Sequence, residues 1–484
     1  MLVKFDIVDK KPCIIASDDV LEAIRHEFSI ENAAKSFVKG FKNKFIPSRL
    51  YAIAATGKYE IGLTPEIIRT IVSKQLASKI EISDAVLARL KPTIDASVYN
   101  KFTLQLRDYQ QHGVKKALEQ GRGICLLATG AGKTLLMASL VASAYSASKD
   151  FKCLIIVPDP GLAMQTFNDF KKYNVPFQTC MWTGEHALDL NANVIIANQR
   201  IILTRAEENE WIEYVDMLIA DEVHTIKKDN KINKIVSKIK TDRRFGLTGT
   251  LPVAALDKWN VLGAFGDVLI IKSSSDLRQQ GFLTNVEAKI INITYKDKVA
   301  APTQTLNKKG EKLTTAKYKA ELDFIYHSEY RNSILKQLCC NFNNNVLILV
   351  NHLDHGATLH ETLKACTNKQ VYYVHGEVEL NDRENIKQIM EKHNDVIVIA
   401  MSKIFSTGIS INNIHMIVFA SGGKSFVRVV QSIGRGLRLH ESKDKLVIID
   451  IHDVLQYGDN HSRKRLQIYD SEKISYKVIP FVEK

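Results

Sequence analysis

Ten short apolar runs constrain the fold of this chain more than any other feature of its sequence. Each is five or six residues long, most are rich in Val and Ile, and stretches with a helical pattern lie between them. Uninterrupted apolarity of this length is typical of strands buried on both faces of a parallel sheet. The runs fall into two sets of five, at 124–128, 153–158, 194–198, 217–221 and 245–249, and at 346–350, 371–375, 396–401, 416–420 and 446–450.

The two sets predict two α/β domains, because strand–helix alternation builds open parallel sheets covered by helices. We expect limits near 101–275 and 276–484, with a polar, lysine-rich connection at about 296–321 inserted in the second domain. Residues 1–100 read as a separate small α+β domain.

Within that small domain, the stretches "SRLYAIAAT" and "GKYEIGL" (48–63) predict a hairpin. The following "TPEIIRTIVSKQLA" predicts a helix with Pro65 in its first turn.

A phosphate-binding loop is predicted at "ATGAGKT", residues 128–134, which follows an apolar strand and precedes a helical stretch. Glycines let backbone N–H groups close around phosphate oxygens at the start of a helix. Lys133 would reach the β and γ phosphates, and Thr134 would hold Mg²⁺. Ala128 departs from the usual pattern, which begins with glycine. The candidate nucleotide-binding residues of the loop are Thr129, Gly130, Ala131, Gly132, Lys133 and Thr134.

A second catalytic candidate is "MLIADEVH", residues 217–224. Its apolar strand ends in two carboxylates at the edge where open α/β sheets bind ligands. Asp221 would hold Mg²⁺ through its water shell, and Glu222 would orient and deprotonate an attacking water. An acidic turn that merely caps a strand is the alternative for this motif alone. The next strand ends in "LTGT" (247–250), whose hydroxyls would sense the site.

The stretch "QSIGRGLR", residues 431–438, places Arg435 and Arg438 three residues apart, on one side of a helix. Gly434 and Gly436 flank the first arginine and weaken the helix locally. Two guanidiniums held side by side in this way predict an anion-binding function, with structural arginines paired to carboxylates as the alternative.

Together with "FSTGISINN" (405–413), these motifs follow the order found in the superfamily-2 helicases and translocases, and the resemblance covers about residues 101–455. The resemblance implies two RecA-like domains in tandem that bind and hydrolyse ATP with Mg²⁺. It also implies that Arg435 and Arg438 are arginine fingers for the γ-phosphate and that Gln431 positions the attacking water.

Four further segments resemble motifs of the same family. "LRDYQ" (106–110) resembles the adenine-reading segment and assigns Arg107 and Gln110 to the nucleotide. "VPDPGLAMQ" (157–165), with Pro158 and Gln165, resembles a motif that contacts the nucleic-acid backbone. "NQR" (198–200) matches another backbone contact more weakly. The sequence then places Thr407 and Gly408 where the family grips the strand and couples it to ATP.

The chain most resembles the UvsW-type helicases of bacteriophages, through its size, the small N-terminal domain, "FSTGIS" and "YYVHGEVELNDR" (372–383). That resemblance implies remodelling of branched DNA: branch migration of junctions, fork regression, and unwinding of R-loops, where RNA is a further partner, or D-loops.

Residues 35–49 contain no acidic residue and alternate Phe with Lys. Cations for phosphates and rings for bases are the parts of a strand-binding surface, so Lys39, Lys42 and Lys44 are candidate DNA contacts. The alternative is a Phe stripe packed in a core beside solvated lysines.

The composition indicates which partners and which cellular compartment suit the protein. A net charge of +13 suits nucleic acid, although excess lysine also serves solubility. The seven cysteines show no metal-ligand spacing, and no apolar run approaches the roughly 20 residues that cross a bilayer. We expect a monomer in a reducing cytoplasm, that of the host cell for a bacteriophage protein, with no membrane partner.

Two alternative functions remain open from the sequence. An RNA helicase would be stimulated by RNA rather than DNA. An ATP-regulated nucleic-acid-binding protein would bind without unwinding, although Lys133, Asp221, Glu222 and Arg438 together speak against a decayed ATPase.

Overall fold

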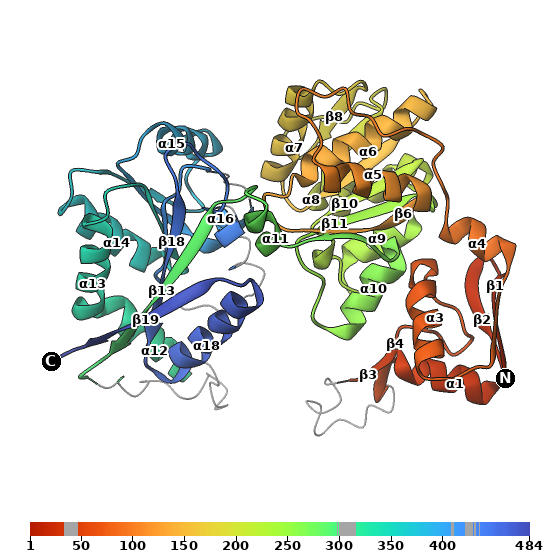
Figure 1. The fold of residues 1–484 in the computed structure, drawn as a ribbon, viewed down its shortest axis with the longest axis horizontal. Helices are drawn as coiled ribbons and strands as arrows, with labels where there is room; N and C mark the ends of the chain where they lie inside the picture. The colour runs from red at the N-terminus through yellow and green to blue at the C-terminus, as the bar shows by residue number, and fades with distance from the viewer. Residues whose placement is uncertain are drawn as a thin grey trace. The chain divides into compact units, whose positions relative to one another are not determined.

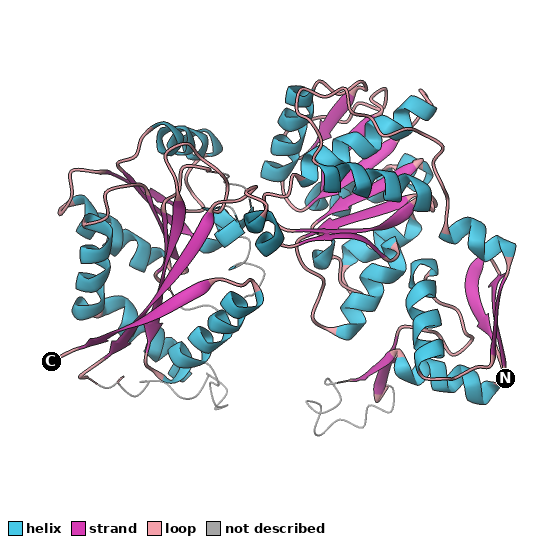
Figure 2. Cartoon of the chain, in the orientation of Figure 1, coloured by secondary structure: helices cyan, strands magenta, loops and turns pink. Residues whose placement is uncertain are grey.

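The computed structural model describes residues 1–32, 47–297, 299, 316–407, 411–421, 429, 432–434 and 436–484. The chain divides into two compact units, one made of Met1–Ala128 with Gly132–Lys272 and the other of Thr129–Ala131 with Ser273–Lys484. Each unit contains a seven-stranded parallel sheet with helices packed on both faces (Figure 1, Figure 2). Two tandem RecA-like domains are therefore confirmed, and the domain limits near residues 100 and 275 remain our proposal.

The N-terminal part of the first unit is a small α+β region, as expected. Its sheet has the order β2-β1-β5, with β2 antiparallel and β5 parallel to β1. Its elements are β1 Leu2–Val8, β2 Lys11–Ile15, α1 Asp18–Glu27, β3 Ser29–Glu31, β4 Arg49–Tyr51, η1 Ile61–Leu63, α3 Thr64–Ser73, β5 Lys79–Ile82 and α4 Asp84–Leu90.

The predicted hairpin over residues 48–63 is wrong, whereas the helix that follows it is confirmed as α3. β4 pairs instead with β3, and residues 61–63 form a 3-10 turn. The alternation had another cause: Tyr59, Ile61 and Leu63 are buried against neighbouring elements rather than within a hairpin. A Cβ on Gly62 would lie 2.4 Å from the carbonyl oxygen of Leu262, so this turn packs directly on the backbone of a motor-domain helix.

The first RecA-like sheet has the strand order β12-β6-β11-β10-β7-β9-β8. All five strands predicted for it are present, and β8 and β12 were not predicted. Its elements are α5 Asp108–Gln120, β6 Arg122–Leu127, α6 Lys133–Ala147, β7 Cys153–Val157, α7 Pro160–Tyr173, β8 Thr179–Trp182, β9 Val194–Asn198, α8 Gln199–Arg205, η2 Ala206–Glu208, η3 Glu210–Tyr214, β10 Met217–Asp221, η4 Val223–Thr225, α9 Lys231–Lys238, β11 Arg244–Thr248, α10 Ala255–Phe265 and β12 Val268–Lys272.

The second RecA-like sheet has the strand order β15-β16-β14-β17-β18-β13-β19. All five predicted strands are again present, and β13 and β19 were not predicted. Its elements are α11 Ser274–Gln279, β13 Asn285–Thr294, α12 Ala316–His327, α13 Glu329–Cys340, β14 Val346–Val350, α14 Leu353–Lys364, β15 Gln370–Val374, α15 Leu380–Lys392, β16 Val396–Met401, α16 Ser402–Thr407, β17 Met416–Phe419, β18 Lys445–Asp453, α18 Gln456–Ser471 and β19 Ser475–Val482.

The N-terminal region and the first sheet share one hydrophobic core, which runs from Val3 to Phe265. Two bidentate ion pairs join them at the surface. Arg69 donates to both oxygens of Asp267 at 2.6 and 3.1 Å, and Arg89 donates to both oxygens of Asp242 at 3.0 and 3.1 Å. The N-terminal region is thus held firmly against the first motor domain.

The lysine-rich connection lies largely outside the described residues, but its last part, from Ala316, begins α12. Glu321 anchors α12 to the start of α18. Its buried carboxylate accepts hydrogen bonds from the backbone N–H groups of Tyr457 at 3.0 Å and Gly458 at 2.7 Å. A long-range anchor of this kind leaves no periodic pattern in the sequence.

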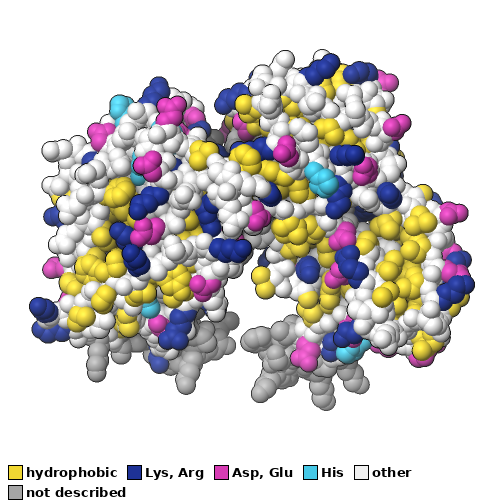
Figure 3. All heavy atoms as spheres, in the orientation of Figure 1, with side chains coloured by type: hydrophobic (Ala, Val, Ile, Leu, Met, Phe, Trp, Pro, Cys, Tyr) yellow, Lys and Arg dark blue, Asp and Glu magenta, His cyan; other side chains and the backbone are white. Residues whose placement is uncertain are grey.

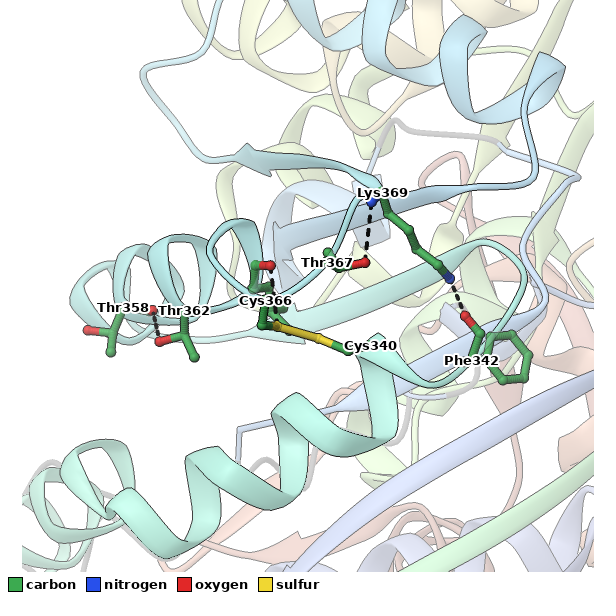
Figure 4. Close-up of a disulfide and its surroundings, with 8 residues drawn as sticks. Cys340, Phe342, Thr358, Thr362, Cys366, Thr367 and Lys369 are labelled. Atoms are coloured by element: carbon green, nitrogen blue, oxygen red, sulfur yellow. Dashed lines mark hydrogen bonds between the residues drawn. A yellow bond between two sulfur atoms is a disulfide. The ribbon is translucent and has the colours of Figure 1, made fainter.

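One cysteine pair was not expected. A disulfide joins Cys340, the last residue of α13, to Cys366 just after α14 (Figure 4). The remaining five cysteines are free and buried, in keeping with their apolar surroundings. Among the described residues, no helix has both the length and the apolarity needed to span a membrane.

Candidate functional site

The predicted phosphate loop connects β6 to α6, at the carboxyl edge of the first sheet. Gly130 and Gly132 have φ of 85° and 73°, a left-handed conformation that glycine adopts without strain. α6 begins at Lys133, so its first backbone N–H groups are free to bind an anion. A Cβ on Gly132 would lie 2.5 Å from Nε2 of Gln110, so this glycine is also required by close packing.

Lys133 meets the two carboxylates that end β10. Its Nζ donates to Oε1 of Glu222 at 2.8 Å and lies 3.7 Å from Oδ1 of Asp221. Glu222 has φ of 51°, a left-handed conformation that a glutamate adopts only at a cost of about 1–3 kcal/mol. Because strain of this kind is kept where the surrounding structure imposes it, the backbone itself turns Glu222 toward the lysine.

The charges at this site are unevenly stabilised. Burial raises the pKa of Asp221, and the nearby Lys133 offsets part of that effect. Burial also opposes ionisation of Glu222, but Lys133 and His224 outweigh it and hold the pKa of Glu222 below its ordinary value. Glu222 is therefore ionised at neutral pH, as a proton acceptor must be.

The residues proposed for Mg²⁺ offer the oxygen ligands that this ion prefers. The side chain of Asp221 is 10% exposed. The hydroxyl of Thr134, half-buried at the start of α6, makes no hydrogen bond to any residue that the structure describes. Both side chains thus fit the ion.

His224 links Glu222 to the "LTGT" segment. Its Nδ1 lies 3.2 Å from Oε2 of Glu222 and 2.9 Å from Oγ1 of Thr248. The hydroxyl of Thr248 donates a hydrogen bond to the carbonyl oxygen of Thr250 at 2.8 Å. Its Oγ1 therefore accepts a hydrogen bond from Nδ1–H of His224. This contact was missed in the sequence, although β10 and β11 are parallel neighbours and so bring their ends together.

Gln110, predicted to read the adenine base, is 2% exposed and engaged within the protein. Its Oε1 accepts from the backbone N–H of Arg107 at 2.9 Å, and its Nε2 donates to the carbonyl oxygen of Gly132 at 3.2 Å. Arg107 donates to the hydroxyl of Tyr109 at 3.1 Å. Gln110 thus connects the start of α5 to the phosphate loop.

Two of the predicted nucleic-acid contacts lie around the start of α7. Pro158 is half-buried directly after β7, and Gln165 is half-buried on α7. Asp159 caps α7 by accepting from the backbone N–H of Leu162 at 3.0 Å. In the weaker motif, Arg200 is exposed and Asn198 is buried.

Arg438 belongs to the second unit, where it is half-buried. The backbone beside it is anchored by Thr284, which donates from N to Leu437 O at 2.7 Å and from Oγ1 to Arg438 O at 3.2 Å. Thr407 ends α16, and its side chain is not described. The other predicted site residues that lie outside the described residues are Lys39, Lys42, Lys44, Gly408, Gln431 and Arg435.

Comparison with known proteins identifies two family matches. Residues 103–253 match the family described as type III restriction enzyme, res subunit, and residues 330–440 match the helicase conserved C-terminal domain. The first match contains the phosphate loop, both carboxylates and "LTGT", and the second contains Arg438.

Individual relatives are similar over most of the chain. The ATP-dependent DNA helicase uvsW of Enterobacteria phage T4 is 29% identical over 395 residues, which cover 76% of each protein. The DNA 3'-5' translocase XPB2 of Sulfurisphaera tokodaii is 22% identical over 80% of this chain and 90% of that protein. The fold is shared with a fragment of a putative HsdR subunit of a type I restriction enzyme from Vibrio vulnificus. That fragment is 15% identical over 90% of this chain and 76% of its own length, with a TM-score of 0.58.

Proposed function

Because this chain belongs to the superfamily-2 helicases, we propose that it is an ATP-dependent DNA helicase that remodels branched DNA. The remodelling comprises branch migration of junctions, regression of forks and unwinding of R-loops or D-loops. The enzyme works as a monomer in the cytoplasm, that of the host cell if its source is a bacteriophage.

The observation that carries the ATPase proposal is the contact of Lys133 with Glu222 and Asp221 at the phosphate loop. A lysine at the start of a helix and two carboxylates at a strand end are the parts that phosphoryl transfer needs. The left-handed glycines leave the backbone N–H groups of the loop free for phosphate oxygens.

In the proposed mechanism, the phosphates of ATP draw Lys133 away from Glu222, and the freed carboxylate accepts a proton from the attacking water. Thr134 and Asp221 would hold Mg²⁺, which would supply positive charge to neutralise the phosphates. Gln431 positions the water. The guanidiniums of Arg435 and Arg438 stabilise the charge that spreads over the γ-phosphate oxygens in the transition state.

The DNA strand is held by backbone contacts from Pro158, Gln165 and Thr407, and the N-terminal lysines Lys39, Lys42 and Lys44 hold a further arm. Affinity is therefore tolerant of sequence and sensitive to salt. On the face drawn in Figure 3, Lys and Arg side chains are interspersed with Asp and Glu.

The test is ATP hydrolysis in the presence of single-stranded, duplex, forked and four-way DNA, and of RNA. We expect DNA to stimulate ATP turnover, with the largest effect for forked and four-way DNA. We also expect branch migration to separate four-way junctions into duplexes without cleavage. Glu222→Gln is the control, since it keeps the side-chain volume and should lower turnover about 100-fold or more. Stronger stimulation by RNA than by any DNA would instead favour an RNA helicase, and binding without turnover would favour a regulatory protein.

A further inference from the structure

A cavity of about 410 Å³ lies where the N-terminal region meets the first motor domain. One wall comes from β2, β4 and the turn before α3, and the other from α9, the start of β11 and α10 (Figure 1). The walls are fixed to each other. Nζ of Lys228 donates to the carbonyl oxygen of Tyr51 at 2.5 Å, and the rings of Phe28 and Trp259 pack with centroids 5.2 Å apart. The cavity is therefore part of a rigid junction.

The lining of this cavity is positively charged. Four cations line it, and two carboxylates, Glu60 and Asp229, offset part of their charge. Of the cations, Lys58 is also paired with Asp9 at 2.8 Å. Lys11 is exposed and forms no ion pair within the described part of the chain. The cationic residues of the lining are Lys11, Lys58, Lys228 and Arg244.

Arg244 is the residue that points to a ligand. The residue is 9% exposed. Its Nε donates a hydrogen bond to the carbonyl oxygen of Thr241 at 2.7 Å, and its Nη2 donates one to the carbonyl oxygen of Ile239. Among the residues that the structure describes, its Nη1 has no hydrogen-bond partner and no carboxylate pairs with it. Burial lowers the pKa of Arg244, and Glu60 and Asp242 offset only part of that effect. A buried guanidinium without a counterion is costly, and an anion in the cavity would remove that cost.

The volume of the cavity and its other lining residues indicate which class of anion it could bind. Ligand cavities for small organic molecules begin at about 300 Å³, so this one holds more than an inorganic ion. Trp259 and Tyr51 line it with aromatic surface on which a base can stack. We propose that this cavity binds one nucleotide unit, with its phosphate at Arg244 and Lys228 and its base against Trp259. The nucleotide is either free or an unpaired nucleotide of a DNA strand, and the site is separate from the ATP site at the phosphate loop.

The test uses the full-length protein without added ADP, which is itself a nucleotide and would compete for the cavity. Each titration is repeated with Lys133→Ala, so that binding at the phosphate-loop site is recognised by its loss in that variant. Thymidine 5′-monophosphate is titrated by calorimetry, with thymidine as the comparison. We expect the monophosphate to bind at least about 10-fold more tightly, because hydrogen bonds between charged groups are the strong ones. A fluorescent ten-residue thymidine oligonucleotide, titrated in parallel, reports binding of a strand.

Two variants and one control locate the binding. Ser237→Trp, at an exposed lining position on α9, should obstruct part of the cavity and weaken binding about 10-fold or more. Lys11→Ala should weaken it about 3-fold by removing one cation. Lys115→Ala is the control for charge, since Lys115 is exposed on α5 away from the cavity and should leave binding unchanged.

The two titrations distinguish the two sources of the nucleotide. Loss of monophosphate binding alone in Ser237→Trp identifies a free nucleotide, and loss of oligonucleotide binding, with or without that of the monophosphate, identifies a strand. The proposal is overturned if neither ligand is affected by Ser237→Trp, or if thymidine binds as tightly as its monophosphate. Normal ATP hydrolysis by Ser237→Trp would show that the variant is folded.

Discussion

Nζ of Lys133 lies 2.8 Å from Oε1 of Glu222, so the lysine of the phosphate loop is paired with the carboxylate proposed as the proton acceptor. Before ATP binds, the pair keeps two buried charges neutralised. In the proposed mechanism, a phosphate that takes over the lysine would release Glu222 to accept a proton from the water that attacks the γ-phosphate. In this proposal, the binding of ATP and the release of Glu222 are linked through the side chain of Lys133.

Lys133→Ala should abolish ATP hydrolysis and leave DNA binding without nucleotide largely intact, because the lysine contacts phosphate rather than DNA. Turnover and DNA affinity are measured on the same preparation, with the exposed Lys115→Ala as the matched control. Wild-type turnover in Lys133→Ala would refute the phosphate-loop assignment.

Arg438→Ala should leave ATP bound but slow hydrolysis by about 10³-fold or more, since an arginine finger acts mainly in the transition state. The segment should keep its position, because Thr284 bonds to its backbone and not to the arginine side chain. Arg438→Lys should also be slow, since an ammonium lacks the guanidinium fork. A collapse of nucleotide affinity with normal residual turnover would mark Arg438 as a structural residue.

Replacing Lys39, Lys42 and Lys44 together by Gln should weaken binding to four-way junctions. It should also reduce the slope of log affinity against log salt by up to about three, because each phosphate contact releases a counterion. The control replaces Lys231, Lys234 and Lys238, which are exposed on α9, by Gln. Equal loss of affinity in both triple variants would show that only net charge matters.

The ion pairs at the N-terminal junction should differ in strength. Arg89 and Asp242 have side chains 35% and 23% exposed, against 52% and 39% for Arg69 and Asp267. Because exposed pairs contribute about 0–1 kcal/mol, Arg69→Ala should change stability by less than about 1 kcal/mol. Arg89→Ala should cost about 1–2 kcal/mol, since it leaves a half-buried carboxylate less well paired. Thermal unfolding of the two variants measures the order, and a larger loss for Arg69→Ala would contradict it.

Acid stability should depend on His355, which is 2% exposed and stacked on Tyr326 with ring centroids 4.6 Å apart. Burial, with a smaller contribution from Arg331, lowers the pKa of His355 from 6.5 to about 3. In the unfolded chain His355 binds a proton below about pH 6.5, whereas in the folded chain it binds one only below about pH 3. The free energy of unfolding should fall as pH drops through this window, by about 2–3 kcal/mol between pH 6.5 and 4.5.

His355→Phe keeps an aromatic ring in place and removes the proton, so its stability should fall less than that of the wild type over the same pH range. His112→Phe, at an exposed position on α5, is the matched control and should follow the wild type. Parallel pH profiles for wild type and His355→Phe would contradict the prediction.

Much of the architecture is readable from local sequence because its cause is local. Runs such as "VLILV" are apolar at every position, and this alone demands a strand covered on both faces. β19 was not predicted, since none of its residues is buried and its sequence alternates weakly at the sheet edge. The phosphate loop was predicted from its motif between an apolar strand and a helical stretch, and the left-handed φ of Gly130 and Gly132 explains why the motif needs glycine there.

Long-range packing decided what the sequence left open. The order of strands brings His224 to Thr248. The docking of the N-terminal region places Gly62 on the backbone of α10 and leaves Arg244 buried with no ion-pair partner among the described residues. The sequence by itself determined five of the seven strands in each large sheet and the place of the phosphate loop, since burial on both faces and backbone conformation are properties of neighbouring residues. Only the tertiary structure decided which side chains meet and which cavity remains, because these depend on residues distant in the chain that pack together.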